Sequence, residues 1–177
     1  MTERRRQPWA SGNLVLSPRL LEQIYAEARA AYARDEESCG LLVGPADSPL
    51  LVDGVVPMKN RANALHALDP ETYPRTGRTY FDIDPLAFER IVRAREAEGR
   101  PVKVLYHSHL DAGAYFSETD AAAITMGGHE PAYDLAYLVT SVRGGEIAEH
   151  ALFVWDPEGR VFAPSELRVD ALARETP

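Results

Sequence analysis

The chain has 177 residues, one cysteine and a formal net charge of −8 at pH 7, with an isoelectric point near 5.1. Its length suits one domain with a real core, and its 45% hydrophobic and 26% charged residues are typical of globular proteins. The acidic balance argues against a nucleic-acid-binding surface, and Cys39 alone cannot form an intrachain disulfide.

The ends of the chain show no targeting or membrane segment. No stretch approaches the ~20 apolar residues of a membrane span, and no secretory leader follows the basic start. We therefore expect a cytoplasmic protein with no membrane or nucleic-acid partner, while the pattern indicates no particular oligomeric state. We expect a poorly ordered tail over residues 1–12, one domain over residues 13–170 and a frayed tail over residues 171–177.

The first part of the chain alternates strands and a helix. A short apolar strand is expected over residues 13–16. A helix is expected over residues 18–33, because Ser17 and the proline after it form a start signal and apolar residues recur at helical spacing. Two more strands are expected over residues 38–43 and 50–58, with a turn rich in glycine and proline between them.

The segment from Asn60 to Arg78 shows no clear periodicity. It is either a loop over a substrate groove, since long loops in compact domains are often functional, or a surface connection, and the pattern favours neither. His66 lies in this segment without another potential ligand at metal-binding spacing. We therefore expect it to be an ordinary loop histidine.

The second part of the chain adds two helices and a series of hairpins. Strands are expected over residues 79–83, 101–109, 133–142 and 147–155 and from residue 161, and helices over residues 85–98 and 118–126. Two glycines after Arg143 indicate a hairpin turn. These elements predict an α+β domain, with a mixed, mainly antiparallel sheet packed by two longer helices and one short helix.

A pair of histidines ends the expected strand of residues 101–109. Because side chains alternate along a strand, His107 and His109 point the same way and can hold one zinc ion. Asp120, in the first turn of the next helix, could supply a third ligand. Three protein ligands with a fourth position left for water are typical of a catalytic zinc site, whereas structural sites use four.

A catalytic zinc site also needs a general base beside its water. Glu36 and Glu37 lie at the mouth of the strand of residues 38–43, and on chemistry alone either could serve. Cys39 follows closely, but no cysteine–histidine pattern surrounds it. We expect Cys39 to be a small buried residue rather than a nucleophile.

Ser117 and Asp120 have a second interpretation. Ser-x-x-Asp matches a capping box, in which the serine caps a helix and the aspartate bonds back to the backbone, and this role alone would explain both residues. A serine can begin a helix while its hydroxyl faces a metal, but one aspartate oxygen cannot easily serve both purposes. The two upstream histidines favour the ligand interpretation.

The combined pattern resembles the JAMM metalloproteases, the catalytic branch of the MPN domains, over roughly residues 13–165. The matching residues are Glu37-Ser38-Cys39-Gly40, His107-Ser108-His109, Ser117 and Asp120. The resemblance implies the MPN (cytidine-deaminase-like) fold and one Zn²⁺ with a bound water, held by His107, His109 and Asp120. It also implies that Glu37, rather than Glu36, is the catalytic base and that Ser117 stabilises the developing oxyanion.

The resemblance also suggests a substrate class. JAMM proteins cut after the C-terminal glycines of ubiquitin-like proteins, and prokaryotic relatives process small ThiS/MoaD-like sulfur carriers. It therefore implies a zinc-dependent (iso)peptidase whose partner ends in Gly-Gly, leaving carrier maturation and deconjugation open. The alternatives are a catalytically silent MPN scaffold, although scaffolds have lost ligands that this chain keeps, and a nucleobase deaminase, whose Pro-Cys-x-x-Cys motif is absent here.

The chain departs from the family pattern at two positions beside the ligands. Many relatives have a proline after the second histidine and another before the serine, where this chain has Leu110 and Phe116. The ligands are kept, so the departure bears on the rim of the groove. The segments 60–78 and 110–116 are therefore the candidate substrate-binding loops.

Overall fold

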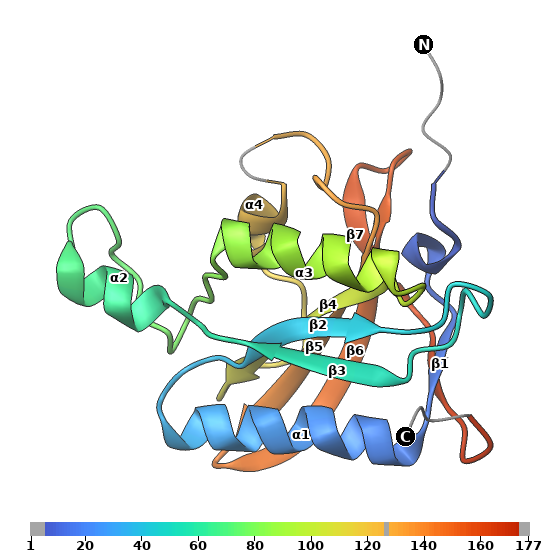
Figure 1. Cartoon of the computed structure of the whole chain (residues 1–177). Coiled ribbons are helices and arrows are strands. Elements are labelled where there is room, and N and C mark those ends of the chain that lie inside the picture. Colours follow the sequence, from blue (N-terminus) through green and yellow to red (C-terminus); the bar gives the residue numbers. More distant parts are fainter. Residues whose placement is uncertain (1–5, 126–127, 174–177) are drawn as a thin grey trace.

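The computed structural model, which describes residues 6–125 and 128–173, is built around a six-stranded sheet with the order β3-β2-β4-β5-β6-β7 (Figure 1). The strands of this sheet are β2 (Cys39–Val43), β3 (Gly54–Met58), β4 (Val102–Leu110), β5 (Ala136–Arg143), β6 (Glu146–Asp156) and β7 (Val161–Ser165). The β4–β5 pair is parallel and the other pairs are antiparallel. A separate parallel pair joins β1 (Leu14–Leu16) to β8 (Leu167–Val169). The mixed, mainly antiparallel sheet confirms the predicted class.

Helices cover both faces of this sheet (Figure 1). The helices are α1 (Pro18–Ala33), α2 (Ala62–Leu68), α3 (Pro85–Ala97) and α4 (Glu118–Ile124), preceded by the 3-10 helix η1 (Pro8–Ser11). One apolar cluster joins α1 to Val104 and Tyr106 of β4. The other joins Phe88 of α3 to Leu105 of the same strand. Among the described residues, no helix combines the length and apolar character needed to cross a bilayer.

The capped helices begin where their sequence signals predict. The hydroxyl of Ser17 accepts a hydrogen bond from the backbone N–H of Leu20 at 3.1 Å, and α1 has the predicted bounds. The carboxylate of Asp84 caps α3 in the same way, 2.9 Å from the backbone N–H of Leu86. The short helix α4 ends at Ile124, and the Met126 and Gly127 positions expected at its end lie outside the described residues.

Two predictions about the middle of the chain are wrong. The strand expected over residues 79–83 does not form; the segment is unpaired, and Phe81 is buried against the ligand-bearing strand. The segment 60–78 was expected to lack regular structure but contains α2, of which only Ala62 is buried. A short helix that exposes most of its surface leaves little hydrophobic periodicity in the sequence.

Part of the segment expected as the N-terminal tail packs against the domain. In the structure, Trp9 of η1 is buried, and its indole N–H donates to the backbone oxygen of Asp134 at 2.9 Å. The indole is amphipathic, so burial of its ring and a partner for its N–H together hold η1 against the domain. Residues 1–5 and 174–177 of the expected tails lie outside the described residues.

Lys103 is buried inside the domain, although lysine is a typical surface residue. Its ammonium group donates to the backbone oxygens of Pro45, Ser48 and Leu51 at 2.8, 2.8 and 2.7 Å. Burial lowers the pKa of Lys103 to about 8. Three acceptors match the three hydrogens of an ammonium group, so Lys103 fastens the β2–β3 connection to β4.

Candidate metal centre

The two histidines of the His-x-His motif lie on the α3 side of the sheet. They share the strand parity of Leu105, so both imidazoles point toward the layer that contains α3 and α4. His107 and His109 are 1% and 5% exposed, so water has little access to either ring except through the site itself. The predicted common direction of the two side chains is confirmed.

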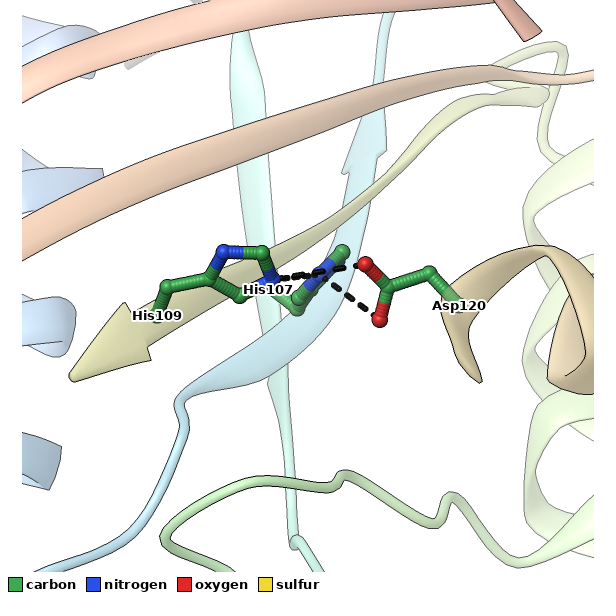
Figure 2. A group of neighbouring side chains, drawn as sticks. All are labelled: His107, His109 and Asp120. Atoms are coloured by element: carbon green, nitrogen blue, oxygen red, sulfur yellow. Dashed lines mark hydrogen bonds and ion pairs between the residues drawn. The ribbon is translucent and has the colours of Figure 1, made fainter. Parts of the chain in front are cut away.

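Asp120 brings its carboxylate to both imidazoles (Figure 2). The two Nε2 atoms are 3.2 Å apart. Nε2 of His107 lies 3.3 Å from Oδ1 of Asp120, and Nε2 of His109 lies 3.3 Å from Oδ2. For a tetrahedral zinc ion with bonds of ~2.0–2.1 Å, neighbouring ligand atoms are separated by ~3.3 Å. The buried group of His107, His109 and Asp120 therefore has the donor types and the spacing to hold a metal ion.

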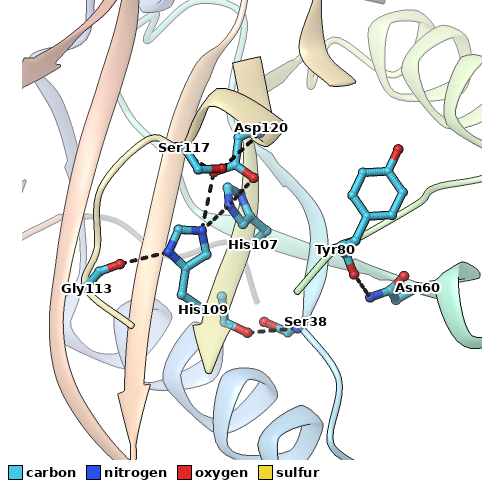
Figure 3. Close-up of polar contacts among 9 residues, drawn as sticks. Ser38, Asn60, Tyr80, His107, His109, Gly113, Ser117 and Asp120 are labelled. Atoms are coloured by element: carbon cyan, nitrogen blue, oxygen red, sulfur yellow. Dashed lines mark hydrogen bonds and ion pairs between the residues drawn. The ribbon is translucent and has the colours of Figure 1, made fainter. Parts of the chain in front are cut away.

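The contacts around the histidines orient them for metal binding (Figure 3). Nδ1 of His109 lies 2.8 Å from the backbone oxygen of Gly113, which can only accept, so Nδ1 carries the hydrogen and Nε2 keeps its lone pair. The ring of Phe81 stacks on His107 with centroids 4.6 Å apart and restricts its rotation. Within the described residues, Nδ1 of His107 has no hydrogen-bond partner.

The protonation states also suit a metal site. Burial is the main cause that lowers the pKa of His107, which favours the neutral imidazole. Burial alone would raise the pKa of Asp120, but the two imidazoles beside it outweigh burial and hold the pKa below its ordinary value. Neutral imidazoles beside a carboxylate are the forms that coordinate zinc.

Ser117 and Asp120 form a complete capping box as well. The Ser117 hydroxyl accepts from the backbone N–H of Asp120 at 3.0 Å, and Oδ2 of Asp120 accepts from the backbone N–H of Ser117 at 2.9 Å. Oδ2 therefore caps the helix and faces His109, while Oδ1 faces His107. A carboxylate oxygen has two lone pairs, so the two interpretations of the sequence are compatible.

Glu37 is buried in the segment that leads into β2. Its backbone N–H donates to Gly77 at 2.7 Å, and its backbone oxygen accepts from the Asn60 amide at 3.1 Å. Among the described residues, its Oε2 atom has no partner. Burial, followed by the charge of Asp120, raises the pKa of Glu37 well above its ordinary value of 4.5, while the charge of Arg75 opposes the shift.

One cavity of about 210 Å³ is lined by Glu37, by Ser117 and by two residues of the metal group, His109 and Asp120. Glu36 instead pairs with Arg34 at 2.9 Å. Both candidate substrate loops reach this cavity, one through Arg75 and Arg78, the other through Leu110, Ala112 and Tyr115. The structure thus surrounds the candidate base and the metal group with the two predicted loops, whose role in substrate binding stays a prediction.

The remaining polar candidates take structural places. His66 lies on α2 with its Nδ1 atom 2.7 Å from the backbone oxygen of Tyr73, and it is not part of the metal group. Cys39 is buried, and burial raises its pKa to about 12, which makes the thiol unreactive at neutral pH. Phe116 packs against Phe162 with ring centroids 4.2 Å apart, so the residue that replaces a proline anchors the rim.

Sequence reasoning missed the residues that position Glu37. The hydroxyl of Ser108 accepts from the backbone N–H of Ser38 at 2.8 Å, and the backbone N–H of Ser108 donates to the Ser38 oxygen at 3.0 Å. Asn60 also holds the backbone oxygen of Tyr80 at 3.0 Å (Figure 3). Because side chains alternate along the strand, Ser108 could be placed on the face opposite the two histidines. Nothing in the sequence indicated the hydrogen-bond partners of Ser108 or Asn60.

Comparisons with known proteins agree with this geometry. Residues 17–155 match the family model described as prokaryotic homologs of the JAB domain. No curated protein sequence matches the chain.

Three solved structures share the fold. A protein from Desulfitobacterium hafniense is 23% identical, with a TM-score of 0.61 over 89% of this chain and 92% of that one. A Salinibacter ruber protein is 24% identical, with a TM-score of 0.57 over 91% and 94%. A JAB1/MPN domain protein from Archaeoglobus fulgidus is 16% identical, with a TM-score of 0.50 over 89% and 96%. These low identities show the fold alone, whereas the family model spans most of the chain, and the chain therefore belongs to the JAB/MPN family as a prokaryotic homolog of the JAB domain.

Proposed function

We propose that this chain is a zinc-dependent peptidase that hydrolyses the bond after the C-terminal diglycine of a ubiquitin-like or ThiS/MoaD-like sulfur-carrier protein. The observation that supports it most directly is the buried group of His107, His109 and Asp120, whose ligand atoms are close enough to hold one metal ion, beside a cavity that Glu37 lines with His109 and Asp120. The group is consistent with a JAMM-type metallohydrolase. The diglycine substrate class comes from the family resemblance, and zinc is our choice of metal because two imidazoles and one carboxylate suit it.

The residues of the chain divide the work of amide hydrolysis. When bound, a zinc ion supplies a Lewis acid that acidifies water and polarises a carbonyl group. The buried carboxylate of Glu37 accepts a proton from the attacking water and passes it to the leaving amine. In the metal-free protein, burial and the charge of Asp120 raise the pKa of this carboxyl above its ordinary value. Water adds across the C–N bond, which leaves a glycine carboxylate and a free amine.

Ser117 is positioned to stabilise the oxyanion. Its hydroxyl oxygen accepts from the backbone N–H of Asp120, so the geometry of that bond fixes the oxygen at the edge of the cavity. The hydroxyl hydrogen is then available for the substrate oxygen. Donors of this kind contribute ~3 kcal/mol to transition-state stabilisation.

The test is intact-mass analysis of a diglycine-ending carrier that bears a short C-terminal extension. We expect zinc-loaded wild type to remove the extension and Glu37→Gln to bind zinc without removing it. Glu36→Gln is the matched control, because it changes the neighbouring charge outside the metal group. No cleavage with zinc bound would redirect the proposal to isopeptide-linked conjugates, whereas no cleavage and no zinc would favour a silent scaffold.

A further inference from the structure

The cavity beside the metal group has a cationic wall. Arg75 and Arg78 both line it. Gly77, which lies between them in the sequence, accepts the hydrogen bond from the backbone N–H of Glu37. Arg78 is already engaged, since its guanidinium pairs with Asp35 and, at 3.0 Å, with Asp111. Within residues 6–125 and 128–173, the Arg75 guanidinium makes no ion pair or hydrogen bond. In the described part of the chain, Arg75 is therefore an exposed cation without a carboxylate partner at the rim of this cavity.

The position of Glu37 tells which part of a substrate would meet Arg75. The general base delivers its proton to the leaving amine, so the leaving group must lie on the Glu37 side of the scissile bond. Arg75 belongs to the chain segment on this side, because Gly77 accepts a hydrogen bond from the backbone N–H of Glu37 at 2.7 Å, and the charge of Arg75 acts on the pKa of the Glu37 carboxyl. Arg75 therefore faces the leaving group and not the diglycine tail.

The volume of the cavity indicates how much of a leaving group can lie inside it. Its volume of about 210 Å³ corresponds to roughly seven water molecules at ~30 Å³ each. A second cavity of about 350 Å³ adjoins it and shares Arg75 and Thr119, which leaves room for one side chain. Each further residue would carry the chain end ~3.3–3.6 Å farther away. A leaving group of one or two residues fits this space best.

We infer that Arg75 binds the free α-carboxylate of the residue released from the carrier, which makes the enzyme a trimming carboxypeptidase and not a deconjugase. A planar guanidinium matches a carboxylate with two parallel hydrogen bonds. A single released amino acid places its carboxylate one Cα from the leaving amine, within reach of this wall. The lysine of an isopeptide-linked protein has no such charge near its ε-amine. This inference rests on the proposed function.

The experiment compares two carriers that differ in one group. Both end in Gly-Gly-Ala, one as the free acid and the other as the C-terminal amide, and kcat/KM is measured by mass spectrometry with zinc-loaded wild type, Arg75→Gln and Arg93→Gln. We expect wild type to prefer the acid by about tenfold or more, since hydrogen bonds between charged groups are the stronger class. Arg75→Gln should reduce that preference to near unity. Arg93, whose side chain is 78% exposed on α3, is the matched control and should keep it.

Binding provides a second readout that does not depend on turnover. Calorimetry with the zinc-loaded Glu37→Gln variant should show the same preference for the acid, and Glu37→Gln combined with Arg75→Gln should lose it. Equal use of acid and amide, an unchanged ratio in Arg75→Gln, or faster cleavage of a lysine isopeptide would overturn the inference while leaving the hydrolase intact. If neither carrier is bound or cut by zinc-loaded protein, the proposed function fails and this inference fails with it.

Discussion

Replacement of Glu37 by glutamine tests the electrostatics of the site through stability as well as through activity. In the metal-free protein, burial and the charge of Asp120 raise the pKa of Glu37 well above 4.5. The change keeps the shape of the side chain and removes its charge. We expect metal-free Glu37→Gln to be more stable than wild type at neutral pH, although it loses turnover.

The magnitude follows from proton linkage. Below about pH 4.5 the carboxyl is protonated in both the folded and the unfolded chain, so Glu37 contributes no pH dependence there. Above that pH the unfolded chain loses the proton and the folded chain keeps it. The free energy of unfolding of wild type then falls relative to Glu37→Gln by up to ~1.4 kcal/mol per pH unit. The difference levels off once the folded protein also ionises.

The assay is urea denaturation of chelator-treated protein at several pH values between 4 and 8. Glu36→Gln is the control, because Glu36 forms a half-exposed ion pair with Arg34 and should show no comparable slope. A stability difference between wild type and Glu37→Gln that does not change with pH would refute the assignment of a buried carboxyl with a raised pKa. Parallel turnover assays, with zinc restored, separate this result from the role of Glu37 as a base.

Three further predictions concern the fold and the site. Lys103→Met should lower the free energy of unfolding by ~3 kcal/mol and the melting temperature by roughly 10 °C, because it leaves buried backbone carbonyls without a donor. The control Lys59→Met, at an exposed position, should change little in the same thermal melts. His109→Ala should lose zinc in metal analysis, while His66→Ala keeps it, and zinc retained by the former would contradict the ligand set. Ser117→Ala should cost ~1 kcal/mol of stability and ~100-fold in kcat, whereas Ser117→Thr, which keeps a hydroxyl, should retain both the stability and the turnover. Unchanged kcat in Ser117→Ala would show that the hydroxyl has no catalytic role.

The parts of the fold that could be predicted are those with strong local signals. The helix α1 begins after Ser17 and buries an apolar stripe, so its sequence shows both an N-cap residue and apolar residues at helical spacing. The spacing of His107 and His109 on a strand likewise determines their common face. The meeting of these histidines with Asp120 follows from the short connection after β4, although only the family resemblance favoured Glu37 over Glu36.

The parts that could not be predicted depend on contacts between distant segments. Residues 79–83 alternate like a strand, yet they pair with no strand of the described structure, and Phe81 packs on His107 instead. Trp9 is buried because the ammonium group of Lys103 lies over its ring and the backbone oxygen of Asp134 accepts a hydrogen bond from its indole N–H. Such partners are more than ninety residues away in the sequence, so no local pattern marks them.

The capping box at Ser117 has a consequence for the life of the protein in the cell. Because the backbone of α4 already holds the Asp120 carboxylate, and Gly113 already holds His109, the site is arranged by the fold itself. In zinc fingers, by contrast, the ion drives folding, and the empty chain is unfolded. If the site binds an ion as proposed, we expect a domain organised in this way to fold first and to take up the ion afterwards. Copies that lack their ion would persist as intact, reloadable molecules, so zinc supply could set the active fraction without new protein synthesis.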